Sequence, residues 1–111
     1  MSDYKNKLEE WIAEKLKPID KYARPTRGSG AGNEIGDISN ALFYVECKIK
    51  GTKENIIIDY KNEWKKLLDD LPINTTKTPL IATENKEGER FITLKAEDFF
   101  EILYLLYLTN D

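Results

Sequence analysis

The sequence predicts a single domain of the α/β or α+β class, with a central mixed sheet of about five strands flanked by helices. The chain has 111 residues, which suits one domain with a modest core. Apolar residues make up 41% and charged residues 33%, a composition typical of globular chains. Segments of helical and strand periodicity follow the order α-β-β-(β)-α-β-β-α, which predicts a sheet covered by helices. We therefore treat residues 1–111 as one domain.

The first predicted element is a helix over residues 3–19. Apolar side chains recur there at helical spacing, at Tyr4, Leu8, Trp11, Ile12, Leu16 and Ile19. Pro18 is expected to end the helix near residue 17, because proline cannot continue the helical hydrogen bonding. Residues 24–37 hold four of the six glycines and are expected to form a mobile loop, or an irregular strand joined to a loop.

The segment 42–50 has the alternating pattern of a strand with two different faces. The face expected toward the core carries Phe43, Val45, Cys47 and Ile49. The second face carries Leu42, Tyr44, Glu46, Lys48 and Lys50. Because the second face holds an unusual pair of opposite charges, it is the first candidate for chemistry.

The next elements are a turn at 51–55, a short strand at 56–58 and a helix over about 60–70, which Pro72 ends. The inner side of this helix is expected to carry Trp64, Leu67, Leu68 and Leu71. Residues 79–84 and 90–94 predict two strands joined as a hairpin around the glycine-containing segment 85–89.

The last predicted element is a helix over 97–108 that is apolar almost all round. Such a helix is expected to be buried on more than one side, by the core and by a partner subunit. Its roughly 12 residues are too few to span a bilayer. The large aromatic residues elsewhere, Trp11, Trp64 and Phe91, and Phe99 in this helix, are expected in the core.

The composition excludes several kinds of chemistry. The chain has no histidine, which excludes Ser-His-Asp and Cys-His catalysis and histidine-ligated zinc. The single Cys47 excludes an intrachain disulfide framework and favours an intracellular location. The N-terminal residues lack the apolar stretch of a signal peptide. A metal would need carboxylate and carbonyl ligands, which suits Mg²⁺, Mn²⁺ or Ca²⁺.

The formal net charge of −3 gives no general attraction to nucleic acid or to an anionic membrane, but the charge is unevenly distributed. Residues 15–27 hold one acidic and five basic residues, a local balance of +4. The basic ones are Lys15, Lys17, Lys21, Arg24 and Arg27. Such a belt is typical of a phosphate-binding face, and a solvated surface with chance clustering is the other interpretation.

Glu46 and Lys48 are two residues apart on the predicted strand, so both project from one face with Cα atoms about 6.6 Å apart. Asp37 follows Gly36 nine residues before Glu46, so a neighbouring strand could place it beside that residue. Two carboxylates and a lysine suit metal-assisted hydrolysis of a phosphodiester, in which the carboxylates hold a cation that activates water. The alternative is an exposed strand with an ordinary ion pair.

The first helix offers a further acidic residue. On a wheel of 100° per residue, Glu9 lies roughly 95° from the centre of the apolar face, and Glu10 lies roughly 165° from it. Glu9 is therefore at a boundary from which its side chain can reach across the sheet, whereas Glu10 faces water. This geometry favours Glu9 as a site residue, with an ordinary solvated glutamate as the alternative.

Three short motifs together resemble the PD-(D/E)XK nuclease superfamily: Gly36-Asp37, Glu46-Cys47-Lys48 and Arg24-x-x-Arg27-Gly28-Ser29-Gly30. Within it, the chain is similar to the archaeal and bacteriophage Holliday junction resolvases from about residue 5 to residue 103. These enzymes carry a helix with a glutamate, a loop with arginine and serine, an aspartate and a Glu-x-Lys strand. The resemblance implies a restriction-endonuclease-like fold. Gly36 departs from it, because a proline usually precedes the aspartate.

The resemblance also implies roles for individual residues. Asp37 and Glu46 would bind Mg²⁺ or Mn²⁺ together with the backbone carbonyl of Cys47. Lys48 would assist the attacking water, and Glu9 would complete the metal site from the helix. The side chain of Cys47 is itself expected in the core, because it falls on the apolar face of the strand.

DNA contacts are implied mainly for the glycine-rich loop. Arg27 and Ser29 would contact phosphate near the scissile bond. The wider binding face would consist of Arg24, Lys15 and Lys61. The resolvases often have a glutamine or lysine on the helix that follows the Glu-x-Lys strand, and Glu63 competes with Lys61 for that position.

The resulting hypothesis is a Mg²⁺-dependent endonuclease that resolves four-way DNA junctions in recombination and repair. A homodimer is expected, because symmetric nicking of a junction requires two active sites. The expected location is the cytoplasm, including the host cytoplasm for a phage-encoded enzyme, without a membrane partner. Two alternatives stay open, namely a non-catalytic DNA-binding or assembly protein on the same fold and a related nuclease that acts on other branched or linear DNA.

Overall fold

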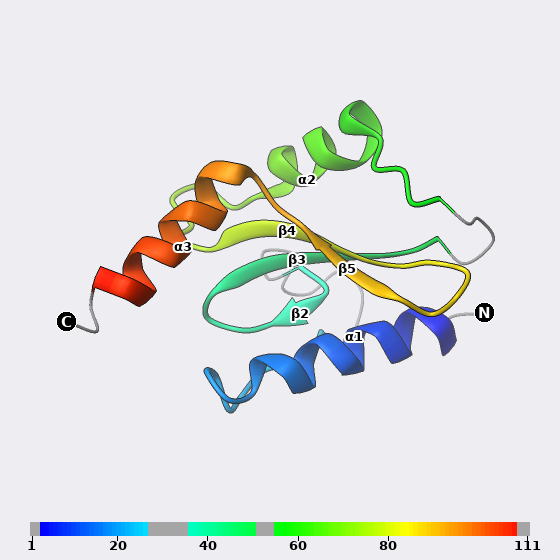
Figure 1. Ribbon diagram of the computed structural model, residues 1–111, viewed down its shortest axis with the longest axis horizontal. Coiled ribbons are helices and arrows are strands. Elements are labelled where there is room, and N and C mark those ends of the chain that lie inside the picture. Colours follow the sequence, from blue (N-terminus) through cyan, green and yellow to red (C-terminus); the bar gives the residue numbers. More distant parts are fainter. Residues whose placement is uncertain (1–2, 27–35, 51–54, 109–111) are drawn as a thin grey trace.

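The computed structural model describes residues 3–26, 36–50 and 55–108 of the chain. Its helices are α1 (Asp3–Leu16), the π-helix η2 (Tyr60–Trp64), α2 (Lys65–Asp70) and α3 (Ala96–Leu108). Its strands are β1 (Arg24–Pro25), β2 (Ile38–Ser39), β3 (Phe43–Ile49), β4 (Thr78–Glu84) and β5 (Arg90–Thr93). Figure 1 shows α1 and α2 on opposite sides of the strands.

The strands form two sheets in the described part of the chain. β3, β4 and β5 make a mixed sheet in that order, with β3 parallel to β4 and β4 antiparallel to β5. β1 and β2 make a short antiparallel pair. The α+β class is thus confirmed. The expected single sheet of about five strands is not found among the described residues. Asp37, which precedes β2, makes one backbone and one side-chain hydrogen bond to the free edge of β3, but β2 and β3 form no continuous ladder of backbone hydrogen bonds.

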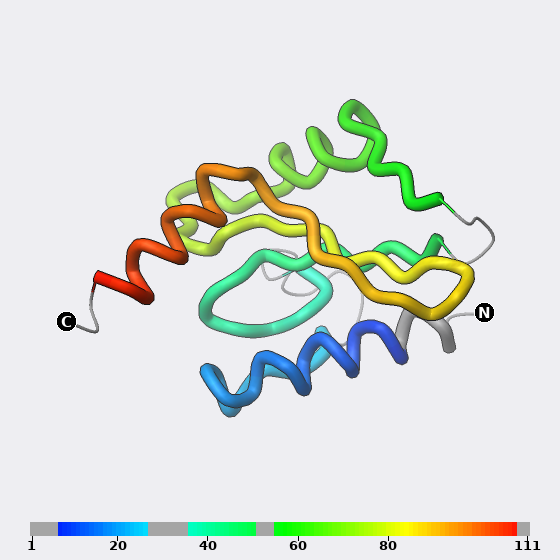
Figure 2. The backbone as a smooth tube through the Cα atoms, in the orientation of Figure 1, coloured from blue at the N-terminus to red at the C-terminus, as the bar shows by residue number. Residues whose placement is uncertain are grey.

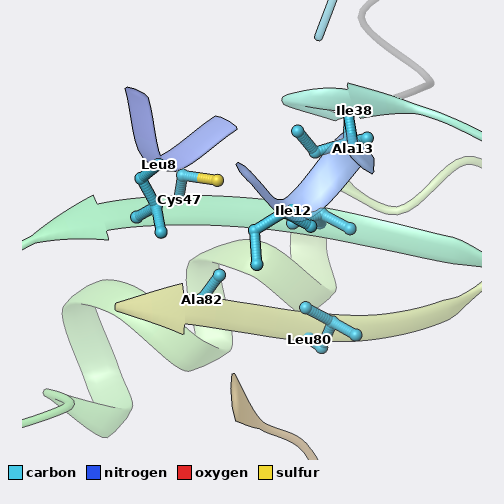
Figure 3. Packing of buried hydrophobic residues seen from close by; sticks show 8 residues of the cluster. Leu8, Ile12, Ala13, Ile38, Cys47, Leu80 and Ala82 are labelled. Carbon is cyan, nitrogen blue, oxygen red and sulfur yellow. The ribbon is translucent and has the colours of Figure 1, made fainter. Parts of the chain in front are cut away.

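Two apolar clusters lie on the two faces of β3 and β4. The cluster under α1 consists of Leu8, Ile12, Ala13, Ile38, Val45, Cys47, Leu80 and Ala82 (Figure 3). The cluster under α2 consists of Tyr44, Trp64, Leu67 and Ile81. The alternation along β3 is therefore as predicted, with Val45 and Cys47 facing α1 and Tyr44 facing α2. β3 and β4 form the middle layer between the two helices (Figure 2).

Several local predictions need correction. The first helix ends at Leu16, close to the end near residue 17 that Pro18 predicts, but Ile19, which the helical spacing predicts on its apolar face, lies beyond it and is 65% exposed. Residues 56–58 are described but form no strand. Trp64 is in the core as predicted, whereas Trp11 and Phe91 are 38% and 47% exposed. Trp11 of α1 lies beside Arg90 of β5, and Phe91 belongs to β5 itself, which is the edge strand of the three-stranded sheet.

The environment of α3 differs most from the prediction. None of its residues, all of which the structure describes, is buried. Figure 1 shows it extending beyond the end of the sheet. Exposed side chains include Phe99, Phe100, Tyr104, Leu105, Leu106, Tyr107 and Leu108. The expected contact with the core on one side is thus wrong within the single chain. Among the described residues, no helix has the length and apolar character needed to cross a membrane.

Candidate functional site

The candidate site begins with Glu46 and Lys48 on β3. Both side chains project from the face that also carries Tyr44, which is the face toward α2. The Lys48 Nζ lies 3.5 Å from the Glu46 Oε2, and the two side chains are 37% and 30% exposed. Solvent can therefore reach both groups. The strand pattern predicts this arrangement correctly.

Asp37 is placed at the free edge of β3, away from β4. Its backbone N–H donates to the Val45 carbonyl at 2.8 Å. Its Oδ2 accepts a hydrogen bond of 2.8 Å from the Cys47 N–H. This second bond holds the Asp37 carboxylate against the peptide that joins Glu46 to Cys47. The structure thus brings Asp37 beside the Glu-x-Lys segment, at the position that the sequence predicts for it.

A tight turn between β2 and β3 fixes this placement. Asn40 is buried, and its Oδ1 accepts from the N–H groups of Leu42 and Phe43 at 2.9 and 2.7 Å. Its Nδ2 donates to the carbonyls of Ile38 and Phe43. Asn40 therefore replaces the backbone bonds that a regular hairpin would make at this point. It acts as a positioning residue, since it sets how β2 and Asp37 meet β3.

The backbone of Cys47 also faces this edge. The N–H and the carbonyl of one strand residue point to the same side of the strand. Because the Cys47 N–H donates to Asp37, the Cys47 carbonyl points to the edge where Asp37 lies. The Cys47 side chain is only 1% exposed and belongs to the cluster under α1, as the sequence predicts.

Glu46 and Lys48 line a small hollow against η2 and α2. The hollow has a volume of about 30 Å³ and its other walls are Asn62, Glu63, Lys66, Leu67 and Asp70. This volume holds roughly one or two water molecules. Sequence reasoning missed Asn62, Lys66 and Asp70. Their spacing of four residues puts them on one helix face, which is the signal that could have found them.

Lys50 and Glu63 form a second ion pair beside this hollow. The Lys50 Nζ lies 2.7 Å from the Glu63 Oε2, and the two side chains are 22% and 15% exposed. The Glu63 Oε1 also accepts from the Asp59 N–H at 2.8 Å. The Asp59 carboxylate caps η2 by accepting from the Asn62 backbone and side chain, which lower the pKa of Asp59. These bonds fix Asn62 and Glu63 at the wall of the hollow.

The pKa of Glu63 lies below its ordinary value of 4.5. Burial raises this pKa, but the hydrogen bonds from Lys50 and from the Asp59 N–H and the charges of Lys50 and Lys48 outweigh burial. A carboxylate whose pKa is lower in the folded chain than in the unfolded chain stabilises the folded state at pH values above its unfolded-state pKa. That contribution is lost as the pH falls through the folded pKa.

We expect Glu63→Gln to reduce stability at pH 7 by about 1–2 kcal/mol, because the amide leaves the Lys50 ammonium without a charged partner. The loss should shrink between about pH 5 and pH 3, where the wild-type carboxylate becomes protonated. Urea unfolding at several pH values measures both effects. Glu87→Gln, at an exposed position of the β4–β5 hairpin, is the matched control and should have little effect. An equal loss of stability in both variants at pH 7 would contradict a stabilising role for the Lys50–Glu63 ion pair.

Glu9 is buried and the neighbouring Glu10 is exposed, as the helix geometry predicts. Glu9 belongs to α1, which packs on the face of β3 opposite to Glu46 and Lys48. Among the described residues, no three cysteine or acidic side chains come close enough together to hold a metal ion. The structure thus brings together Asp37, Glu46 and Lys48. The role of Glu9 in the site stays a prediction.

The predicted DNA contacts are distributed around the fold. Arg24 is exposed on β1, which pairs with β2 beside Asp37. Lys15 is exposed on α1, with its Nζ 5.4 Å from the centre of the Trp11 ring. Lys61 is exposed on η2 and is not among the hollow's lining residues. Arg27 and Ser29 lie outside the described residues.

Comparisons of the chain with protein-family models, with curated proteins and with solved structures gave no match.

Proposed function

We propose that the protein is a Mg²⁺-dependent, structure-specific DNA endonuclease that resolves four-way junctions. One observation carries the proposal. The Asp37 carboxylate is hydrogen-bonded to the peptide that follows Glu46, and Lys48 is ion-paired to Glu46 on the same strand. An aspartate at the edge of a strand, with a glutamate and a lysine on the adjoining face, supplies the side chains that metal-assisted phosphodiester hydrolysis uses in a chain without histidine.

The donor atoms at this edge fit Mg²⁺ or Mn²⁺. Carboxylate oxygens of Asp37 and Glu46 and the Cys47 carbonyl would hold the ion, and hard cations of this type prefer oxygen ligands. When bound, the ion supplies a lowered pKa for water and positive charge opposite the phosphate. The Lys48 ammonium, which is 37% exposed, can orient the attacking water and offset negative charge at the phosphate. Glu46 holds Lys48 beside this edge through their ion pair.

The proposed substrate is bound through its phosphates. Arg24 lies on the β1–β2 side of the site, and Arg27 and Ser29 follow it in the sequence. Lys15 and Lys61 would extend the contact surface. Because such contacts release counterions, affinity should fall steeply with salt and depend little on base sequence. Symmetric nicking of a junction needs two sites, so a homodimer acting in the cytoplasm belongs to this proposal.

The experiment that tests this function is cleavage of a labelled four-way junction in the presence of Mg²⁺ or EDTA. We expect paired nicks at symmetric positions with Mg²⁺ and none with EDTA. A linear duplex that contains the sequence of one junction arm is the matched control and should be cut at least about 100-fold more slowly, a difference of about 2.7 kcal/mol. Equal rates on both substrates would contradict junction specificity and favour a nuclease for other branched or linear DNA.

One observation favours a second candidate, a non-catalytic DNA-binding or assembly protein. The site contributes only two side-chain carboxylates among the described residues, and the net charge is −3. This candidate predicts junction binding without any metal-dependent nicking. The same assay therefore distinguishes the two functions.

A further inference from the structure

The helix α3 carries far more exposed apolar surface than its own chain covers. The exposed fractions are 46% and 48% at Phe99 and Phe100, and they rise to 69% and 71% at Tyr107 and Leu108. The helix therefore has its largest exposed surface at the end that extends beyond the sheet (Figure 1). An apolar patch of this size is typical of an interaction surface.

A complementary surface lies between α1 and the sheet. A groove of about 300 Å³ is lined on one side by Trp11, Ile12, Lys15 and Leu16 of α1. The strands supply its other wall, with Phe43, Val45, Leu80 and Ile92. Apart from Lys15 the lining side chains are apolar, and Ile92 is 47% exposed. The groove exists because α1 covers β3 and leaves β5 open.

The charges around the two surfaces are opposite in sign at a few positions. At the rim of the groove, the Lys15 Nζ lies 5.4 Å from the centre of the Trp11 ring. The Arg90 guanidinium lies 5.0 Å from the same ring, but its charge is already balanced by Glu84 at 2.8 Å. The first two turns of α3 carry Asp98 and Glu101 beside Glu97, which pairs with Lys95 at 3.2 Å. Lys15 on the groove and Asp98 and Glu101 on the helix therefore give the two surfaces complementary charge.

We propose that α3 of one copy of this chain lies in the α1–β5 groove of a second copy, and that the second copy returns the same contact. Such an exchange gives a two-fold symmetric dimer in which the contact between α3 and the groove occurs twice. Four aromatic and four aliphatic side chains, each at least about one-third exposed, offer on the order of 700 Å² around each α3, and a partner surface on one side covers about half of it. Two copies of α3 covered in this way, together with the partner surfaces opposite them, bury on the order of 1,400 Å², which lies within the roughly 1,200–2,000 Å² of a stable interface.

The first test is the mass of the full chain in solution, measured by light scattering. We expect a dimer for the wild-type protein. Leu105→Glu should raise the dimer dissociation constant at least about 100-fold, because each dimer contains the new charge twice. Leu105 is 64% exposed, so this change leaves the single chain folded. Ile73→Glu is the matched control at a 90% exposed position outside α3 and the groove, and it should leave the dimer intact. A wild-type monomer at about 100 μM would overturn the proposal.

The second test locates α3. We would mix isotope-labelled Ile92→Cys protein with unlabelled Leu106→Cys protein, oxidise the mixture and identify the linked peptides by mass spectrometry. The native Cys47 is 1% exposed and should not react. We expect disulfides that join a labelled to an unlabelled chain between positions 92 and 106. Links between two copies of position 106, without this pair, would show an α3–α3 interface and overturn the groove assignment.

A third protein, the double variant Ile92→Cys with Leu106→Cys, tests whether α3 covers the groove of its own chain. Links confined to one chain in this variant, together with a monomeric mass, would overturn the proposal in favour of that arrangement. None of these readouts depends on nuclease activity. A dimer without cleavage would contradict only the proposed function, and a cleaving monomer would contradict only the interface.

Discussion

Replacing Lys48 by alanine is expected to lower the rate of junction cleavage by about 10³-fold while DNA affinity changes little. The Lys48 ammonium lies 3.5 Å from the Glu46 carboxylate, beside the edge that holds Asp37. Its loss removes the group that orients the attacking water and offsets charge at the phosphate, and leaves the carboxylates in place. Single-turnover cleavage with Mg²⁺ measures the rate, and fluorescence anisotropy without Mg²⁺ measures the affinity.

Lys86→Ala is the matched control for this prediction, because Lys86 is exposed in the β4–β5 hairpin, away from the site. Its cleavage rate should stay within about twofold of wild type, since exposed substitutions have small effects. An unchanged rate in Lys48→Ala would contradict the catalytic role of the Glu-x-Lys strand. An equal loss in both variants would indicate that DNA binding, and not the chemical step, had been weakened.

Replacing Gly36 by alanine is expected to destabilise the fold by about 2–4 kcal/mol. Gly36 has a φ of +71°, a conformation that alanine adopts at a cost. A Cβ on it would also lie 2.8 Å from the Val45 carbonyl oxygen and 3.2 Å from the Val45 nitrogen. Both contacts are with the backbone of β3, which cannot move without breaking the bond between Asp37 and Val45. Urea unfolding measures the loss.

Gly88→Ala separates the two causes. Gly88 has a φ of +82°, but nothing lies within 4 Å of a Cβ placed there. The free energy of unfolding of Gly88→Ala should therefore fall only by the cost of the backbone conformation, about 1 kcal/mol. If the two variants were equally stable, the backbone of β3 would be able to shift and make room for a Cβ at position 36. The glycine at position 36 would then have no steric explanation.

Local sequence patterns predicted the parts of the fold that depend on one periodicity. Alternation along β3 separates Val45 and Cys47 from Tyr44, Glu46 and Lys48, because each residue of a strand faces opposite to the next. The hairpin of β4 and β5 and the second helix follow from equally local signals. The burial of Glu9 relative to Glu10 also followed from helix geometry alone.

The remaining features depend on contacts between distant segments. The Lys50–Glu63 pair joins residues 13 positions apart, and no spacing rule links a strand residue to the following helix. The periodicity of 97–108 predicted a helix, but it does not specify what covers that helix. The same holds for Phe99, which was expected in the core and is 46% exposed. The two-sheet arrangement depends on the Asn40 turn, whose side chain replaces backbone bonds.

Mn²⁺ binding to the protein without DNA, measured by electron paramagnetic resonance at a fixed Mn²⁺ concentration, tests most directly whether Asp37 and Glu46 hold a metal ion. Asp37→Asn and Glu46→Gln each remove one negative ligand without changing size. Asp70→Asn is the control, because Asp70 lines the hollow but pairs with Lys66. We expect one bound ion per wild-type chain, at least about tenfold weaker binding in the first two variants, and no change in the control. Wild-type affinity in both Asp37→Asn and Glu46→Gln would show that these two carboxylates do not hold the metal.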